Sequence, residues 1–320
     1  MKGLYTEKIS NSEEKRLKII IEKLIKQGFI KCKNELKDII IERFCDDGEG
    51  EINRYNVFKV NNVNDDNQEY VLKKSDEKEI FVYQELLEGK GFNVPKFYGS
   101  VEENDIKWIL IEYIQGTDLR DFNKEMAIAC AESITKVMNT YWQNNSEDFV
   151  KNKIDDRFER YYDRINERAK CLENEELIKK AYDVFIERQL ICPRTLCNGD
   201  FLQFNGIYKN GKVSVIDWAF AGIMPYSLDI ARLITHGTED KRAFPFYMND
   251  ELRKNFIEEV YSRLLYKPNK EQYLYDIKLA MLNECVEFIE AELHDENLER
   301  DAGFEYYYNT AKKIAREIDI

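Results

Sequence analysis

The first hydrophobic pattern along the chain is that of a helix. Four apolar residues recur at the three- and four-residue spacing of one helix face: Leu17, Ile20, Ile21 and Leu24. Ser10 and Glu13 precede them with the spacing of a capping box, and Gly28 follows them. The pattern therefore predicts an amphipathic helix of about 15 residues that ends near Gly28.

The next part of the chain, from about residue 39 to residue 74, has the pattern of strands. Short extended runs such as YNVFKV and EYVLKK alternate with polar turn segments such as NNVNDDNQ. We expect antiparallel strands here. A helix over residues 77–87 and two more strands, near FYGSVE and KWILIEYI, are expected to follow.

Beyond about Asp118 the periodicity is mostly helical, apart from one hairpin near residue 210. The 320 residues amount to about two domains, since an average domain has roughly 150 residues. We therefore expect an α+β protein with two lobes. The N-terminal lobe, residues 1–114, would be built on an antiparallel sheet, and the C-terminal lobe, residues 115–320, would be mainly helical.

Composition narrows the choice of partner and compartment. With 43% hydrophobic and 34% charged residues, the chain is neither disordered nor fibrous. A formal net charge of −13 argues against nucleic acid and an anionic membrane as partners, and suits a cationic ligand better. The seven cysteines lack CxxC spacing, so we expect reduced thiols rather than disulfides or a zinc site. The start of the chain has no apolar run, and no later segment approaches about 18 uncharged apolar residues, so a cytoplasmic location is expected.

The segment CNGDFLQFNGIYKNGKVSVIDWAFAG, residues 197–222, brings polar side chains together. Asn210 and Gly211 have the composition of a type I′ turn, which fixes the register of the hairpin around them. Following this register outward, Asn205 and Asp217 emerge at the open end of the hairpin within about 5 to 7 Å of each other. Asp200 lies in the short loop five residues before Asn205.

Convergent carboxylate and amide oxygens are the ligands that Mg²⁺ prefers in proteins. The segment therefore indicates a magnesium site formed by Asn205 and Asp217, and it leaves Asp200 as a carboxylate that can position a nucleophile. A carboxylate base is expected because the chain has only two histidines, His236 and His294. The alternative is that the three residues merely cap turns and helices, as these residue types often do.

On these residues the sequence resembles the aminoglycoside phosphotransferase family, which has a protein-kinase-like two-lobe fold. The family's catalytic loop usually reads HGD, four residues and Asn, and here the order is NGD, FLQF and Asn205. The resemblance implies that Asp200 accepts or orients the proton of the attacking hydroxyl, while Asn205 and Asp217 hold magnesium against the nucleotide phosphates. It also implies that Asp229, in MPYSLDIARL, is a structural cap that holds the catalytic loop.

The N-terminal half contains nucleotide-binding residues in the order that the resemblance implies. The run YVLK ends at Lys73, which would reach the α- and β-phosphates, with the neighbouring Lys74 as the alternative. Glu79 opens the following helix and would pair with that lysine. Glu77 and Glu85 are alternatives on the same helix.

Two further segments complete the resemblance in the N-terminal half. The run ILIEYIQG resembles the connection between the lobes, where backbone groups of Glu112 and Ile114 would hydrogen-bond the nucleotide base. The stretch DDGEGEINRYNVFKV resembles the phosphate-covering hairpin, with Gly48 and Gly50. It is not a Walker A loop, because no GK[ST] follows.

One departure from the family concerns the residue before Gly-Asp. Asn198 stands where the family has histidine, so any hydrogen bond by which that histidine orients the loop must be replaced or lost. Because the carboxylate, the metal ligands and the lysine are present, we expect an active enzyme. The rival is a kinase-fold protein that binds nucleotide without turnover.

Residues 284–305 are strongly acidic, with Arg300 as the single base. Nine acids fall in this stretch: Glu284, Glu287, Glu290, Glu292, Asp295, Glu296, Glu299, Asp301 and Glu305. An acidic wall beside the catalytic loop would concentrate a cationic acceptor, with Glu284 and Glu287 as the nearest contacts. The alternative is a solvated helix face opposite Val286 and Ile289.

We therefore expect a small-molecule kinase that moves the γ-phosphoryl group of ATP or GTP, with Mg²⁺, to a hydroxyl of a cationic small molecule. The first expectation for the acceptor is an aminoglycoside, which would imply antibiotic resistance. An amino alcohol or a sugar is the alternative, since it would use the same catalytic groups.

Overall fold

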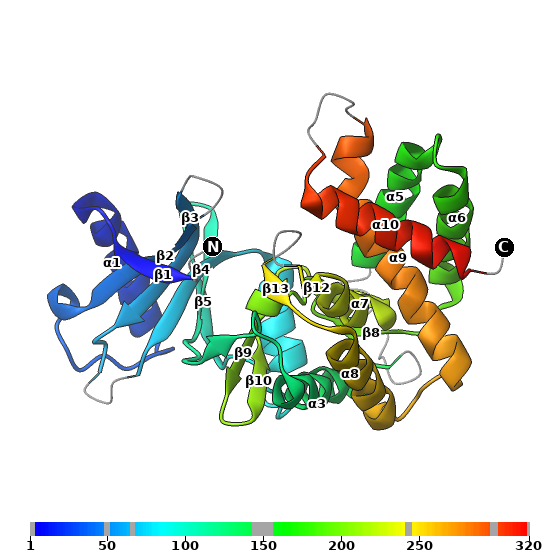
Figure 1. Ribbon diagram of the computed structural model, residues 1–320. Coiled ribbons are helices and arrows are strands. Elements are labelled where there is room, and N and C mark those ends of the chain that lie inside the picture. Colours follow the sequence, from blue (N-terminus) through cyan, green and yellow to red (C-terminus); the bar gives the residue numbers. More distant parts are fainter. Residues whose placement is uncertain are drawn as a thin grey trace. The chain divides into compact units, whose positions relative to one another are not determined.

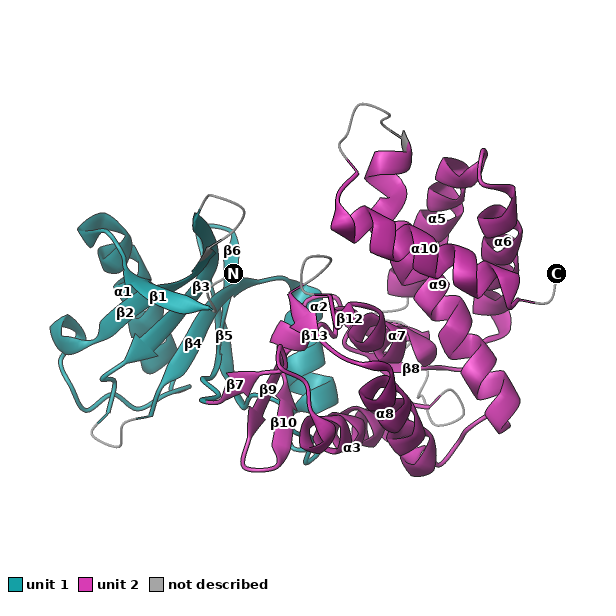
Figure 2. Ribbon diagram, viewed as in Figure 1, with its two compact units in different colours: residues 1–115 teal, residues 116–320 magenta. Residues whose placement is uncertain are grey.

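The computed structural model describes residues 4–47, 52–64, 68–142, 156–240, 245–294 and 300–318. The chain divides into two compact units, Met1–Gln115 and Gly116–Ile320 (Figure 2). Each unit has a hydrophobic core of its own. Gly48 and Gly50, the glycines of the predicted phosphate-covering hairpin, lie outside the described residues.

Unit 1 is built on a six-stranded antiparallel sheet with the strand order β1-β2-β3-β4-β6-β5 (Figure 1). The strands are β1 (Tyr5–Lys8), β2 (Ile40–Asp47), β3 (Ile52–Asn61), β4 (Tyr70–Ser75), β5 (Phe97–Glu103) and β6 (Ile106–Glu112). The antiparallel strands predicted between residue 39 and KWILIEYI are confirmed, and β1 is an additional edge strand.

Helix α1 (Asn11–Lys26) begins where the capping box predicts. The Ser10 hydroxyl accepts a hydrogen bond from the Glu13 backbone N–H at 3.3 Å. The four apolar residues of the predicted face are buried in one cluster with sheet residues that include Phe58, Leu72 and Trp108. Each buried side chain of this size contributes roughly 1.5 to 3 kcal/mol, so packing on the sheet stabilises the helix more than its intrinsic propensity does.

The helix predicted over residues 77–87 has two parts, α2 (Glu77–Phe81) and the π-helical segment η2 (Val82–Leu87). Asp76 caps it, because its carboxylate accepts the Glu79 backbone N–H at 2.8 Å. A single 3₁₀ turn, η1 (Leu36–Asp38), precedes β2.

Unit 2 is mainly helical. Its helices are α3 (Lys124–Thr140), α5 (Asp156–Arg168), α6 (Glu176–Ile191), α7 (Ser227–Thr235), α8 (Asp250–Arg263), α9 (Lys270–His294) and α10 (Ala302–Arg316), with short 3₁₀ turns η3 (Ala169–Leu172) and η4 (Gln203–Asn205). Helices α5, α6, α9 and α10 share one core, in which Phe185 and Val286 are fully buried (Figure 1). Helix α3 packs on α8, and α7 packs on α9.

The strands of unit 2 are short. They are β7 (Thr117–Asp118), β8 (Arg194–Cys197), β9 (Gly206–Lys209), β10 (Lys212–Val215), β11 (Gly222–Pro225), β12 (Gly237–Thr238) and β13 (Phe246–Tyr247). The predicted hairpin is β9–β10. The lobe also has strand pairs that the periodicity did not predict, since β8 pairs with β11 and β12 with β13. Strand β11 is buried at every position, so it shows no polar alternation from which a strand could be predicted.

The seven cysteines are free thiols, as their spacing predicted. Among the described residues, no helix carries an apolar stretch long enough to cross a lipid bilayer.

Candidate functional site

The hairpin β9–β10 has the register that the sequence predicts. Lys209 pairs with Lys212, and both turn residues have positive φ, 50° at Asn210 and 77° at Gly211. At the open end, the Ile216 N–H donates to the Asn205 carbonyl at 2.9 Å. The backbone therefore brings Asn205 next to the segment that carries Asp217, as expected from the turn.

Hydrogen bonds to Asp229 of α7 hold the loop that carries Asp200. The two carboxylate oxygens of Asp229 accept the backbone N–H groups of Asn198 (2.7 Å) and Gly199 (3.0 Å). Burial raises the pKa of Asp229 to about 6, although these two hydrogen bonds oppose the shift. The predicted role of Asp229 as a structural cap of the catalytic loop is confirmed.

Gly199 allows the loop to approach the segment that follows Asp217. Its φ is +83°, and a Cβ at this position would lie 2.3 Å from the Phe220 carbonyl oxygen. Any side chain would force the two segments apart, so only glycine fits between the catalytic loop and the 217–222 segment.

Asn198 links the same two segments. Its Nδ2 donates to the carbonyls of Ile216 (3.2 Å) and Asp217 (2.8 Å), and its Oδ1 accepts the Asp200 N–H at 3.2 Å. The side chain is 1% exposed. These three bonds hold Asp200 and Asp217 in adjacent loops, although the histidine of the family's motif is absent.

Asn205 and Asp217 supply hard oxygen ligands of the type that Mg²⁺ takes. Asn205 Nδ2 donates to the Asp200 carbonyl (2.7 Å) and to Asp200 Oδ2 (3.1 Å), so its Oδ1 is the amide atom left for a metal. Asp217 adopts a left-handed φ of 54°, which is uncommon outside glycine. Mg²⁺ is usually bound by one or two protein oxygens and completed by phosphate oxygens and water, and the chemistry of these two side chains fits such a site.

Asp200 forms an ion pair with Arg232 of α7. Its Oδ1 accepts hydrogen bonds from Arg232 Nη2 (2.9 Å) and Nε (3.2 Å). Burial raises the pKa of Asp200 above its ordinary value, while the charge of Arg232 opposes the shift. One oxygen of the carboxylate is thus held in place, and Oδ2 lies on the side of Asn205.

The same arginine binds two carboxylates of α9. Arg232 Nη1 donates to Glu284 at 2.8 Å and to Glu287 at 3.3 Å. His236 Nε2 lies 2.9 Å from the same Glu284 oxygen, and its Nδ1 lies 2.8 Å from the Tyr307 hydroxyl. Burial lowers the pKa of His236, so the neutral ring donates from Nε2 to Glu284 and accepts from Tyr307. Burial alone would raise the pKa of Glu284, but Arg232 and His236 hold it below its ordinary value.

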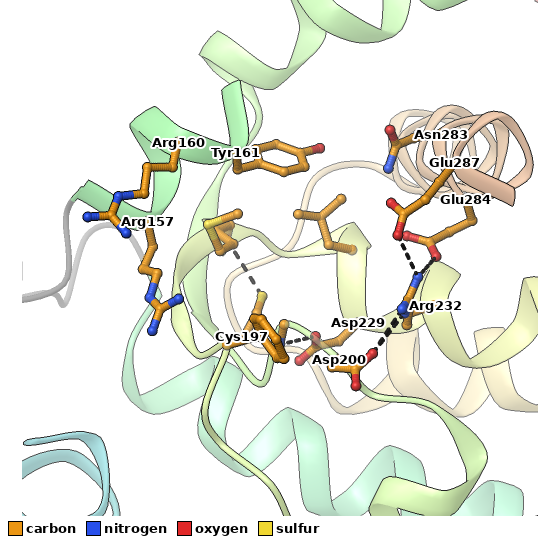
Figure 3. Close-up of a pocket in the computed structure, with 14 residues that line it drawn as sticks. Arg157, Arg160, Tyr161, Cys197, Asp200, Asp229, Arg232, Asn283, Glu284 and Glu287 are labelled. Carbon is orange, nitrogen blue, oxygen red and sulfur yellow. Dashed lines mark hydrogen bonds and ion pairs between the residues drawn. The ribbon is translucent and has the colours of Figure 1, made fainter. Parts of the chain in front are cut away.

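A pocket of about 550 Å³ lies above Asp200 within unit 2 (Figure 3). Helix α5 contributes Arg157, Arg160 and Tyr161 to its lining, and α7 contributes Arg232. Helix α9 contributes three further side chains to the lining: Asn283, Glu284 and Glu287. Figure 3 shows the two α5 arginines at one side of the pocket and the α9 side chains at the other.

In unit 1, Lys73 and Glu79 form the ion pair that the sequence predicted. Strand β4 lies between β3 and β6, and Lys73 Nζ lies 2.8 Å from Glu79 Oε1. The side chains are only 12% and 2% exposed, and the Ser75 hydroxyl donates to the other Glu79 oxygen at 2.7 Å. The alternatives do not form this pair, since Lys74 lies over the Trp108 ring and Glu85 is exposed.

Glu112 ends β6, and its backbone N–H donates to the Lys96 carbonyl at 2.8 Å. Ile114 follows two residues later, close to the end of unit 1 at Gln115. The structure therefore places Glu112 at the end of β6 and Ile114 in the chain that leaves the sheet.

The acidic stretch of residues 284–305 is only partly an exposed wall. Glu284 is 5% exposed, so the alternative that it belongs to a solvated helix face is wrong. Glu287 is 36% exposed and also pairs with Arg168 at 2.8 Å. Asp301 caps α10. The acids Asp295, Glu296 and Glu299 lie outside the described residues.

The sequence reasoning missed three arginines of the pocket: Arg157, Arg160 and Arg232. Arg232 follows Asp229 by three residues, so helical periodicity places both side chains on one face of α7. That spacing was the available signal for Arg232. No comparable signal marks Arg157 and Arg160 in a helix rich in charged residues.

Solved structures that share this fold include two kinases of small amino alcohols and an aminoglycoside phosphotransferase. An ethanolamine kinase from Plasmodium vivax is 14% identical, with a TM-score of 0.59 over 98% of this chain and 91% of that chain. A choline kinase from Cryptosporidium parvum is 16% identical, with a TM-score of 0.58 over 93% and 94%. A thermostable mutant of the aminoglycoside phosphotransferase APH(4)-Ia, in a complex with AMP-PNP and hygromycin B, is 15% identical, with a TM-score of 0.55 over 92% and 97%. These likenesses confirm the predicted kinase-like α+β fold.

The sequence itself matches a family profile. No curated protein matches the sequence of this chain. The profile of the phosphotransferase enzyme family, however, matches residues 49–259, which is more than half of the chain and includes Lys73, Asp200, Asn205 and Asp217. On this match, which also bears out the resemblance found in its motifs, the chain belongs to the phosphotransferase enzyme family.

Proposed function

We propose that this enzyme transfers the γ-phosphoryl group of ATP or GTP to a hydroxyl group of a small molecule. The observation that carries the proposal is the position of Asp200: its carboxylate lines a pocket of about 550 Å³, and its loop is tied to the Asp217 segment. A hydroxyl bound in that pocket would meet a carboxylate that is already oriented by two hydrogen bonds from Arg232.

Unit 1 would bind the nucleotide. Lys73, oriented by Glu79, would contact the α- and β-phosphates, as lysine on the third strand does in kinases. The Glu112 N–H is engaged by Lys96, so the Glu112 carbonyl and the backbone N–H of Ile114 are the groups that we assign to the base.

Asn205 and Asp217 would hold Mg²⁺ against the phosphates of the nucleotide. When bound there, Mg²⁺ neutralises the phosphates and aligns the γ-phosphoryl group. The side-chain amide of Asn205 donates its hydrogen bonds to Asp200, which leaves its amide oxygen for the metal. Asn198 donates a hydrogen bond to the Asp217 carbonyl and so fixes the backbone of Asp217. A loss of either hydrogen bond would turn a ligand away from the metal.

Asp200 would accept or orient the proton of the attacking hydroxyl. Its Oδ1 receives both Arg232 hydrogen bonds, so Oδ2 is the oxygen that we assign to the proton. Most of the rate enhancement would come from positioning and electrostatic stabilisation, because phosphoryl transfer needs little covalent help from the protein.

For the acceptor, we propose a small hydroxylated molecule with a cationic group near Glu287 and Glu284. An aminoglycoside is one candidate. The enclosure of Glu284 by Arg232 and His236 favours the second candidate, an acceptor with a single amino group such as an amino alcohol, since little negative charge is left for a polycation. The free thiols support the proposal that it acts in the cytoplasm.

The test is a pair of substitutions at the proposed site. Asp200→Asn should lower turnover about 10²-fold or more while nucleotide affinity stays nearly unchanged. Asp217→Ala should abolish the magnesium-dependent rise in melting temperature that nucleotide causes. Asp183→Asn, at the surface of α6, is the control and should change neither quantity.

Two results would contradict the proposal. Unchanged turnover in Asp200→Asn would remove Asp200 from the reaction. Wild-type protein that binds nucleotide with magnesium, but transfers phosphate to no hydroxylated compound in a broad panel, would identify a nucleotide-binding protein without activity.

A further inference from the structure

The pocket above Asp200 has an uneven distribution of charge. Its lining contains three arginines, Arg157, Arg160 and Arg232, and four carboxylic acids, Asp200, Asp229, Glu284 and Glu287. Figure 3 shows Arg157 and Arg160 together at one side, away from the carboxylates of α9. The pocket is therefore polarised, with a basic side on α5 and an acidic side on α7 and α9.

The acidic side is largely neutralised by the protein itself. The Arg232 guanidinium donates hydrogen bonds to the carboxylates of Asp200, Glu284 and Glu287 at distances of 2.8 to 3.3 Å. Arg168 also donates a hydrogen bond to Glu287, at 2.8 Å. The Asp229 carboxylate accepts hydrogen bonds from two backbone N–H groups. A polycation would gain little from carboxylates that already have partners, because it would have to displace buried arginines.

On the basic side, contacts with the 219–222 segment hold Arg157 in place. Arg157 Nη2 donates to the Ala219 carbonyl at 2.7 Å, and a Cβ on Gly222 would lie 2.8 Å from Arg157 Cβ. Phe158 is buried in the core beside the pocket, with the Arg194 guanidinium 3.4 Å from its ring centroid. Arg157 and Arg160 are three residues apart, so they stand on one face of a helix whose start is anchored.

We infer that the acceptor carries a carboxylate or phosphate group besides its hydroxyl, and that Arg157 and Arg160 bind this group. The inference rests on the proposed function, since it assigns the substrate class of the same pocket. Guanidinium groups are planar and present paired N–H donors, which match carboxylate and phosphate oxygens. An acceptor with an amino group near Glu287 and an anionic group near Arg157 and Arg160 would complement both sides of the pocket.

Matched pairs of compounds test the inference. The two members of each pair differ in one anionic group: ethanolamine and L-serine, 3-amino-1-propanol and L-homoserine, glycerol and glycerol 3-phosphate. Binding of each compound is measured by calorimetry on the protein loaded with Mg²⁺ and AMP-PNP, and phosphate transfer is measured separately with ATP. In at least one pair we expect the anionic member to bind about 10-fold or more tightly than its partner.

Substitutions assign the effect to the two arginines. In R157Q/R160Q the advantage of the anionic member should fall below about 3-fold, because glutamine keeps hydrogen-bonding capacity but not charge. R164Q is the matched control. Arg164 lies one turn further along α5, pairs with Glu290 at 2.6 Å and is not part of the pocket lining, so R164Q should keep the preference.

Several results would overturn the inference. The first is that the anionic member binds no more tightly than its partner in any pair. The second is that the preference for the anionic member survives in R157Q/R160Q. The third is that R157Q/R160Q loses binding or turnover equally for both members of each pair. The last result would assign the arginines to the transferred phosphoryl group instead. If the wild type transfers phosphate equally well to the members that lack the anionic group, only this inference fails. If it binds no nucleotide with magnesium, the proposed function fails with it.

Discussion

Both units contain a largely enclosed cation bound by carboxylate, and the two arrangements differ in how far along the chain the bound carboxylates lie. In unit 1, Lys73 pairs with the carboxylate of Glu79, six residues away in the chain. In unit 2, Arg232 is shared by Asp200, Glu284 and Glu287, which lie 32, 52 and 55 residues away. A compact ammonium suits a single carboxylate, whereas the planar guanidinium can serve several at once.

The difference has consequences for stability and for chemistry. Loss of Lys73 would leave one buried carboxylate, which the Ser75 hydroxyl still contacts. Loss of Arg232 would leave three carboxylates close together without their shared cation, and one of them is the proposed catalytic residue. The shared cation therefore couples the orientation of Asp200 to the two α9 carboxylates that line the same pocket.

The largest effect is expected from Arg232→Met. Breaking a buried ion pair by removing one partner typically destabilises by about 3 to 5 kcal/mol, and three carboxylates should place this variant at the upper end. Native-state hydrogen exchange in α7 and α9 would measure the loss. The control is Arg188→Met, which removes a similar two-bond pair with Asp276 but does not touch Asp200. It should lose stability and keep turnover where it is folded.

A smaller loss, about 2 to 3 kcal/mol, is expected from Lys73→Met, because the remaining Glu79 keeps one hydrogen bond and can take up a proton. Hydrogen exchange in β4 and α2 would show it. Lys74→Met, next to it on the strand, should lose under about 1 kcal/mol, since Lys74 only lies over the Trp108 ring. Equal losses for Lys73→Met and Arg232→Met would show that sharing the cation has no energetic consequence.

A double-mutant cycle sharpens the comparison further. Adding Glu284→Gln to Arg232→Met removes a buried charge that has lost its guanidinium partner and keeps only the His236 hydrogen bond, so the double variant should be more stable than the sum of the single losses by about 1 to 2 kcal/mol. Chemical denaturation of the four proteins measures this coupling. Strict additivity would mean that Arg232 and Glu284 do not interact in solution.

The smallest effect concerns pH. Burial holds the pKa of His236 below its ordinary 6.5, so the unfolded chain binds this proton more readily than the folded protein does. The free energy of unfolding should therefore fall as pH drops below about 6.5, and His236→Gln should flatten this slope by up to about 1 kcal/mol between pH 7 and 5. Urea midpoints at several pH values would reveal it. A slope that stays the same in the variant would show that other groups around Glu284 titrate instead.

Local patterns determined much of this protein. The cap and apolar face of α1, the positive φ values at Asn210 and Gly211, and the hairpin register could be read from residues close together in the chain. These features follow from backbone geometry, which acts over a few residues. The pairing of Lys73 with Glu79 also follows from a short spacing, on a strand and the helix directly after it.

The tertiary structure alone decided which carboxylates of the pocket are already paired with arginine. The sequence presented Glu284 and Glu287 as an acidic wall, and nothing in that stretch indicates that Arg232 and Arg168 reach them from other helices. Short, fully buried strands such as β11 could not be predicted from the sequence either, since they carry no alternation of polar and apolar residues. The physical reason is the same in both cases: burial and ion pairing depend on what packs against a residue, and those neighbours lie far away along the chain.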